Sequence, residues 1–291
     1  SRMTKMCKSM MAICMLSLGW MQSLYLLNSM PITARDLSFS GGGGAMMSEQ
    51  ISLNPSTITA EQKYKKIHTQ LLPAGISLLS YHTIYPKNGF IYFSSISNLN
   101  FGTLRDGITN KTFYANDLMI KGGIKKSLFQ MISVGTSVSY TLSLIEKSIA
   151  QSLLFSAGLR TEITEDQIGF GLTLRNLGFQ FDHFENLKEE IPYQLQASYF
   201  MKPKHLPALI FSDVVMEEYI DGYTLITGME FYPRDGLTLR FSDSGLLYNG
   251  FELSSLAFGF QFNIKNWTIS LASRNLISAG FINGITLGKR F

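Results

Sequence analysis

The sequence predicts an all-β fold: a transmembrane antiparallel β-barrel of about 14 strands, with a short N-terminal plug. Three observations favour it: apolar and polar residues alternate along most of the chain, short turns alternate with longer connections, and only 16% of the residues are charged. Soluble domains usually carry about 25% charged residues. After residue 34 no apolar run approaches the roughly 18 residues of a membrane helix. Any membrane crossing must therefore be made by strands.

Residues 1–34 have the pattern of a secretory signal peptide. Arg2, Lys5 and Lys8 precede a long uncharged segment that ends at Ala34, like the n-region and h-region of exported proteins. We expect export and cleavage near Ala34, and an uncleaved membrane anchor is the alternative. Both cysteines lie in this leader, so the mature chain would contain no thiol and no disulfide.

The charge balance argues against a nucleic-acid partner. The chain carries a formal net charge of +4, and its first 34 residues hold three cations and no carboxylate. The mature chain would therefore be close to neutral. Binding to nucleic acid depends on a strong basic surface, so that class of partner is excluded.

Residues 35–60 lack the alternation and are expected to form the plug, or hatch, before the barrel domain at 61–291. Gly41 to Gly44 free the backbone, and residues 45–47 then predict a short helix that ends before Pro55. The glycines could form an anion-binding nest. No Gly-Lys-Ser/Thr follows them, so a flexible turn is the preferred interpretation.

The strands of the barrel are read from period-two alternation. In residues 132–144 the even positions are mostly large and apolar and the odd positions small and polar, so the even set should face lipid and the odd set the lumen. The expected strands are 63–71, 75–83, 89–97, 113–124, 129–144, 148–160, 167–175, 192–201, 206–212, 223–232, 237–242, 251–263, 267–273 and 281–291.

The connections between these strands differ in length on the two sides. Those after even-numbered strands are mostly short, and the longer ones after odd-numbered strands are 98–112, 176–191, 212–222 and 242–250. Outer-membrane barrels have short periplasmic turns and longer external loops. A soluble all-β chain would also alternate, and it remains the alternative.

The last expected strand ends on Phe291. A barrel has no free edge, so this strand must pair with the first one. A terminal Phe also resembles the C-terminal signal by which outer-membrane barrels are recognised for insertion. We therefore predict that Phe291 takes part in barrel assembly, in the outer membrane of a Gram-negative cell.

A resemblance to a known family lies in the hatch. The segment "ARDLSFSGGGGAMMSEQISLNPST", residues 34–57, resembles the N-terminal pattern of the PorV/PorQ family and the related FadL transporter group. Those proteins have an Asn-Pro-Ala motif in a hatch inside a fourteen-stranded barrel. Asn54 and Pro55 match it, and Ser56 replaces the Ala. Residues 169–184 and 189–214 resemble the PorQ branch, which implies a component of type IX secretion.

Two functions follow. The preferred hypothesis is a noncatalytic barrel that binds type IX secretion components or cargo, with outer-membrane lipid as its surroundings. Aromatic residues of the long connections would be the contacts. The alternative is a FadL-like transporter of hydrophobic molecules, with apolar hatch residues lining a pocket. The loop residues are Phe179, Phe181, Phe184 and Tyr219, and the hatch residues are Met46, Met47, Ile51 and Leu53.

No catalytic, metal or cofactor site is expected. The histidines (His68, His82, His183 and His205) lack the spacing of a metal site. Ser137 and His183 are conceivable hydrolase partners but share no local motif. Basic residues mark most short turns, where they would anchor the barrel at the membrane interface or dock an acidic partner: Lys87, Lys125, Lys126, Lys202, Lys204, Arg234 and Lys265.

Overall fold

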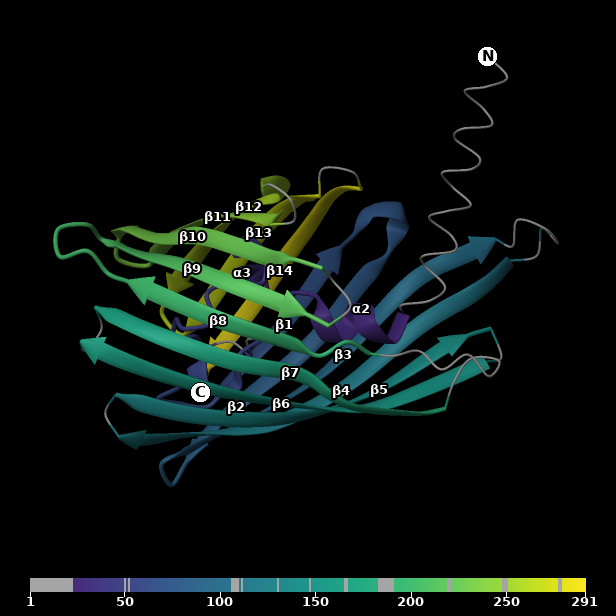
Figure 1. Ribbon diagram of the computed structural model, residues 1–291, viewed down its shortest axis with the longest axis horizontal. Helices are drawn as coiled ribbons and strands as arrows, with labels where there is room; N and C mark the ends of the chain where they lie inside the picture. Colours follow the sequence, from purple (N-terminus) through teal and green to yellow (C-terminus); the bar gives the residue numbers. More distant parts are fainter. Residues whose placement is uncertain are drawn as a thin grey trace, which may run out of the picture.

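The structure is a computed structural model that describes residues 23–49, 51, 53–105, 110, 112–129, 131–146, 148–164, 167–182, 191–218, 221–247, 251–276 and 279–291. Within these ranges the chain forms one closed antiparallel barrel, whose fourteen strands follow sequence order around the wall. Figure 1 shows the strands as a tilted ring, with the helices α2 and α3 inside it. The predicted fold class is confirmed.

The strands are β1 (Tyr64–Leu71), β2 (Ser77–Lys87), β3 (Phe90–Arg105), β4 (Thr112–Phe129), β5 (Ile132–Ile145), β6 (Ser148–Thr164), β7 (Ile168–Asp182), β8 (Gln194–Met201), β9 (Ala208–Glu217), β10 (Tyr223–Arg234), β11 (Leu237–Leu247), β12 (Phe251–Ile264), β13 (Trp267–Leu276) and β14 (Gly280–Arg290). The described helices are α2 (Ser23–Ser29) and α3 (Ala34–Ser38), with the 3-10 turns η1 (Pro55–Thr57) and η2 (Pro73–Gly75). None of these helices has the length and apolar character to span a bilayer.

The barrel closes between its first and last strands. β1 and β14 pair along the full length of β1, beginning at Tyr64 and Arg290. The backbone N–H of Phe291 then donates to the carbonyl of Lys63 at 2.9 Å. The predicted closure by the last strand is confirmed. We call this end of the barrel, where β1 begins and β14 ends, the turn end, and the opposite end the loop end.

The wall has the predicted faces. In β5, Ser137 is 1% exposed in the lumen, whereas Val138 is 38% exposed on the outer surface, and the alternation continues along the strand. Large apolar side chains cover the outside of the other strands, as a bilayer requires. Among them are Ile67, Leu79, Ile96, Phe155, Leu172, Phe258 and Leu271.

The predicted long connections are in large part strand, which corrects the sequence interpretation. β3 extends to Arg105, β7 to Asp182, β9 to Glu217 and β11 to Leu247. In β3, β7 and β11 the register shifts near the point where the predicted strand ends, at 100–103, 174–177 and 244–245. A β-bulge breaks the period-two alternation although the backbone ladder continues beyond it, so the sequence pattern stops before the strand does.

The hatch has its helix in a different place from the one predicted. Residues 44–46 form a turn instead of a helix, and the helix α3 lies at Ala34–Ser38, with Thr33 as its N-cap residue. The Thr33 side chain accepts from the N–H of Asp36 at 3.1 Å. Ser40 and Gly41 have φ values of 54° and 87°, and this left-handed turn ends the helix. The core lies between the hatch and the inner wall.

Residues 23–34, which the sequence assigns to the leader, lie inside the barrel. Asn28 of α2 donates through Nδ2 to the Thr141 hydroxyl of β5 at 3.0 Å. The Gln70 side chain of β1 donates to the carbonyls of Pro31 and Ile32, both at 2.7 Å. Residues 1–22 lie outside the described part of the chain. The predicted cleavage near Ala34 stays a prediction.

Candidate functional site

The Asn-Pro motif of the hatch sits in a notch of the wall. Asn54 is fully buried, and its Nδ2 donates to the carbonyl of Gly44 at 2.6 Å while its Oδ1 accepts from the N–H of Ser56 at 3.0 Å. Gly135 of β5 and Gly158 of β6 face each other across the strand pair. A Cβ at Gly158 would collide with Asn54, and one at Gly135 would collide with Pro55. Asn54 and Pro55 therefore anchor the hatch to β5 and β6.

The glycine run of the hatch contacts a neighbouring part of the wall, a few strands further along the barrel. The N–H of Gly44 donates to Oδ2 of Asp213 in β9 at 3.0 Å, and Gln196 of β8 donates to the same oxygen at 2.6 Å. A Cβ at Gly42 would lie 2.6 Å from the Phe211 ring. The run thus allows the hatch backbone to approach β8 and β9 closely, and one of its amides binds a carboxylate of the protein itself.

The loop end of the lumen contains an apolar group of side chains, which we call the loop-end cluster. Leu27 and Met30, from α2 and the residue that follows it, pack on Leu78, Leu99 and Met119 of β2, β3 and β4. The three wall residues are at most 2% exposed. Barrel interiors are usually polar, so an apolar inner face shielded by a helix is an unusual feature of this lumen.

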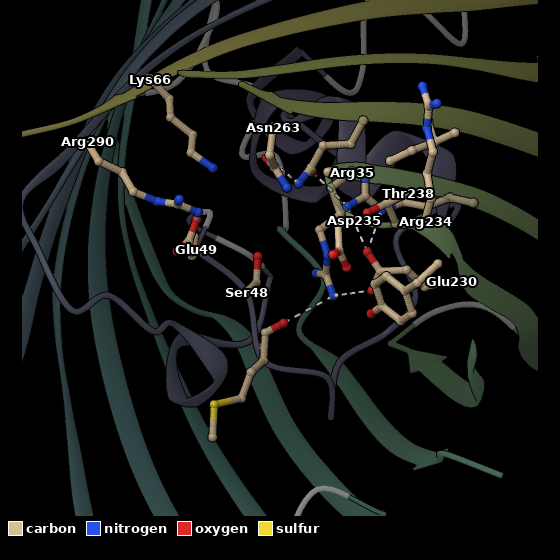
Figure 2. A pocket seen from close by; sticks show the side chains of 16 residues that line it. Arg35, Ser48, Glu49, Lys66, Glu230, Arg234, Asp235, Thr238, Asn263 and Arg290 are labelled. Carbon is tan, nitrogen blue, oxygen red and sulfur yellow. Dashed lines mark hydrogen bonds and ion pairs between the residues drawn. The ribbon is translucent and has the colours of Figure 1, made fainter. Parts of the chain in front are cut away.

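The turn end contains a cavity of about 540 Å³ between the hatch and the wall, which we call the basic cavity. Figure 2 shows its side chains, with Lys66 and Arg290 extending from one side and Arg35 and Glu230 facing them. Its lining, as far as the structure describes it, holds five cations and three carboxylates. They are Arg35, Lys66, Arg234, Arg240, Arg290, Glu49, Glu230 and Asp235.

Ion pairs in the basic cavity join the hatch to the wall. Glu230 of β10 lies 2.7 Å from the Arg240 guanidinium and 3.9 Å from that of Arg35 in α3. Arg290 of β14 lies 2.7 Å from Glu49 of the hatch. The first group is deeply buried and the second half-exposed. A second cavity, of about 410 Å³, shares Glu49 and Arg290 with the first, so this pair stands between the two.

One acidic residue of the hatch, Asp36, is buried close to Arg35 of the basic cavity. Asp36 of α3 is 3% exposed, and burial raises the pKa of its carboxyl group, an effect opposed in part by the neighbouring Arg35. The Asp36 carbonyl accepts from the N–H of Gly41 at 2.9 Å, which fixes the turn after α3.

Two of the four histidines, which the sequence places in separate strands or loops, meet across a pair of neighbouring strands. His68 of β1 and His82 of β2 are buried side by side in the lumen, with ring centroids 4.1 Å apart. His68 Nδ1 lies 2.7 Å from the Thr286 hydroxyl, and His82 Nε2 lies 2.8 Å from the Ser80 hydroxyl. The described residues contain no group of three potential metal ligands. His183 lies outside the described residues.

The aromatic residues predicted to bind partners are only partly described. Phe179 and Phe181 are 54% and 51% exposed near the loop end of β7 and pack edge to face at 4.8 Å. Within the described ranges β8 pairs with β7 only as far as the Arg175–Gln194 pair, so both rings lie on a strand edge. Phe184 and Tyr219 are outside the described residues.

The hatch residues predicted to line an apolar pocket are separated. Met46 is buried in an apolar cluster with Phe39 and Phe211, and Ile51 belongs to a different cluster near Tyr64. Met47 is 43% exposed and lines the basic cavity. Leu53 is half-buried, near Gly41. The structure does not bring these residues together into one pocket.

The sequence interpretation missed the loop-end cluster and the basic cavity. Leu27 and Met30 were assigned to a leader, although the polar pair Asn28-Ser29 interrupts the apolar segment there and could have marked its end. The basic residues predicted to mark the turns lie in different environments. Arg234 lines the basic cavity, Lys125 is buried on the lumen side of β4, and Lys126 lies over the Phe90 ring.

The chain resembles solved outer-membrane barrels. The Pseudomonas putida toluene transporter TodX matches with a TM-score of 0.70 at 10% identity, over 91% of this chain and 99% of that chain. A Pseudomonas aeruginosa FadL homologue matches with a TM-score of 0.63 at 12% identity, over 91% and 99%. No protein-family model and no curated protein matches. At these identities the likeness concerns the fold, and the chain therefore has the fold of FadL-like outer-membrane barrels.

Proposed function

We propose that the chain is a noncatalytic outer-membrane transporter of small hydrophobic molecules. The observation that carries the proposal is the apolar inner face formed by Leu78, Leu99 and Met119. An aqueous pore would be lined by polar side chains, since water and polar solutes interact more favourably with a polar surface. A hydrophobic molecule at this face would replace the contacts made by Leu27 and Met30.

Apolar contacts continue from this face toward the hatch. Leu72, in the connection between β1 and β2, packs both on the loop-end cluster and on a second cluster that includes Ala34 and Leu37 of the hatch. A hydrophobic solute could therefore move from the loop end to α3 without losing apolar contact. α3 packs on β11 to β14 inside the barrel (Figure 1), and a shift of the hatch would open the route beyond it.

The likeness of fold supports the same proposal. TodX is a toluene transporter and the P. aeruginosa protein is a FadL homologue. Both match nearly their whole length to this chain. Toluene is consequently the first probe to use.

The experiment is uptake of radiolabelled toluene by Gram-negative cells that produce the chain in their outer membrane. Met119→Gln places an amide on the apolar face and should lower the initial rate severalfold. Met119→Leu keeps the face apolar and nearly conserves volume, so it is the matched control. Equal rates in cells with and without the chain, or in the two variants, would contradict the proposal.

A second candidate, the partner-binding role implied by the PorV/PorQ resemblance, is favoured by the exposed Phe179–Phe181 pair. Exposed aromatic residues on a strand edge suit a protein contact. The double change Phe179→Ser and Phe181→Ser would test it in a cell with type IX secretion. Cargo release should fall while toluene uptake is kept, and unchanged release would remove this candidate.

A further inference from the structure

We propose that the basic cavity at the turn end is a binding site for a small oxyanion, either a carboxylate or a phosphate. This inference does not depend on the transport proposal, because it concerns residues at the other end of the lumen. It begins with an imbalance of charge: the described lining holds five cationic side chains and three carboxylates.

Two of the three carboxylates are already engaged in ion pairs. Glu230 is held between Arg240 and Arg35, and Glu49 is paired with Arg290. Asp235 lies in the exposed turn between β10 and β11. An incoming anion would therefore meet cations whose counter-charges are incomplete.

Lys66 is the buried cation of this lining that makes no ion pair within the described residues, and the carboxylate whose charge acts on it, Glu49, is already paired with Arg290. Its side chain is 3% exposed, and among the described residues no carboxylate oxygen lies within the 4.0 Å of an ion pair. Its Nζ lies 4.1 Å from the centre of the Tyr64 ring. A buried ammonium group without an anion is costly, and an oxyanion in the cavity would offset that cost.

The remaining lining supplies donors of the right kind. Figure 2 shows Lys66 pointing toward the Arg290–Glu49 pair, with Asn263 and Arg35 across the cavity. Guanidinium groups bind carboxylates and phosphates through paired N–H donors. The volume of about 540 Å³ falls within the 300–1,000 Å³ typical of small-molecule sites. The exposed turn residues Arg234 and Asp235 at its edge place the site at the mouth of the turn end.

The competing explanation is that these charges only hold the hatch in place. It accounts for Arg35 and Arg290, which make ion pairs across the boundary between hatch and wall. It leaves Lys66 without an ion pair in the described residues, because Lys66 lies in the wall and Glu49, the hatch carboxylate whose charge acts on it, is paired with Arg290. The two explanations also predict opposite effects when Glu49 is neutralised.

The experiment is calorimetric titration of the purified full chain in detergent with inorganic phosphate and, separately, with succinate, at low salt. Lys66→Gln should weaken binding about tenfold or more, since it removes the buried cation that makes no ion pair within the described residues. Lys126→Gln, at the turn end but over Phe90, is the matched control and should leave binding unchanged. Glu49→Gln releases Arg290 from its partner and should strengthen binding.

Each possible result of the titrations either supports or overturns the proposed oxyanion site. Binding of phosphate alone, or of succinate alone, supports the site and identifies its ligand chemistry. Absence of binding for both anions, or equal affinity in the original chain and in Lys66→Gln, overturns the proposal. If Lys66→Gln does not fold, Glu49→Gln still tests it, because a purely structural role predicts weaker or unchanged binding there. Toluene uptake is measured separately, so failure of either proposal leaves the other standing.

Discussion

The barrel wall and the hatch are stabilised in different ways. Each wall strand is held by backbone ladders to two neighbours over most of its length, and its side chains need only be apolar outside and compact inside. The hatch has two short helices and one isolated bridge in its described residues, so it depends on side-chain contacts and on notches in the wall. The stability of the wall should therefore depend on the polarity of its outward-facing side chains. The position of the hatch should depend on the shapes of the residues that it contacts.

The largest effect is expected from a charge on the outer wall. Val138→Arg, at the middle of β5, should destabilise the folded barrel by about 2–4 kcal/mol, because the guanidinium would enter the bilayer near its midplane. Leu144→Arg, on the same face near the loop end, should cost about 0–1 kcal/mol. Urea unfolding in lipid vesicles measures both. Similar losses of stability in the two variants would contradict the expected dependence on depth in the bilayer.

A change of shape on the inner wall should come next. Gly158→Val would push into Asn54 and should displace the hatch at a cost of about 1–3 kcal/mol, while the barrel stays closed. Gly122→Val, at a position in β4 with open space around it, is the control. Protease cleavage within residues 39–60 reports hatch release, and heat-modifiable migration reports the closed barrel. Equal protection of the hatch from protease in both variants would contradict the inference that Gly158 makes room for Asn54.

Loss of a hatch hydrogen bond should be smaller. Asn54→Ala removes the donor to the Gly44 carbonyl and the acceptor for Ser56, which should destabilise the hatch by about 1–2 kcal/mol. Asn54→Asp keeps the acceptor but puts a buried carboxylate oxygen against the Gly44 carbonyl, so it should destabilise the hatch more than Asn54→Ala. Hydrogen exchange of the amides in residues 41–57 measures the change. Slower exchange in Asn54→Asp than in Asn54→Ala would be evidence against this account.

The smallest effect is expected at the chain end. Phe291 is 58% exposed and makes a backbone bond to Lys63 and contacts with Lys65 and Lys289 at 5.3 and 5.1 Å. Its deletion should cost about 1 kcal/mol and lower the folded yield in membranes. Phe291→Tyr keeps the ring and the backbone bond and should restore the yield. If the deletion left the folded yield unchanged, Phe291 would not be needed for closure of the barrel.

Sequence alone predicts the wall well for a physical reason. Lipid outside and a packed lumen inside impose a period of two on every strand, so the faces of β5 can be read from residues 132–144. The extent of β3, β7, β9 and β11 could not be read in this way. β-bulges interrupt the alternation in β3, β7 and β11, while hydrogen bonding between the strands continues.

The candidate sites were much harder to predict. The basic cavity brings together residues from β1, β10, β11, β12, β14 and the hatch, and no local pattern links Lys66 to Glu230. His68 and His82 meet because β1 and β2 pair in one particular register. Asn54 and Pro55 were recognisable as a motif, but the glycines that receive them lie on two other strands.

The contacts of α3 have a consequence for the order of assembly. The N–H of Ala34 donates to the Thr286 hydroxyl, 252 residues later in the chain, and the Ser40 and Ser242 hydroxyls meet across 202 residues. The hatch is synthesised before any barrel strand, yet these partners are synthesised near the end. Such distant pairings form slowly. The contacts that hold the N-terminal segment in place can therefore form only after the last strands have been synthesised.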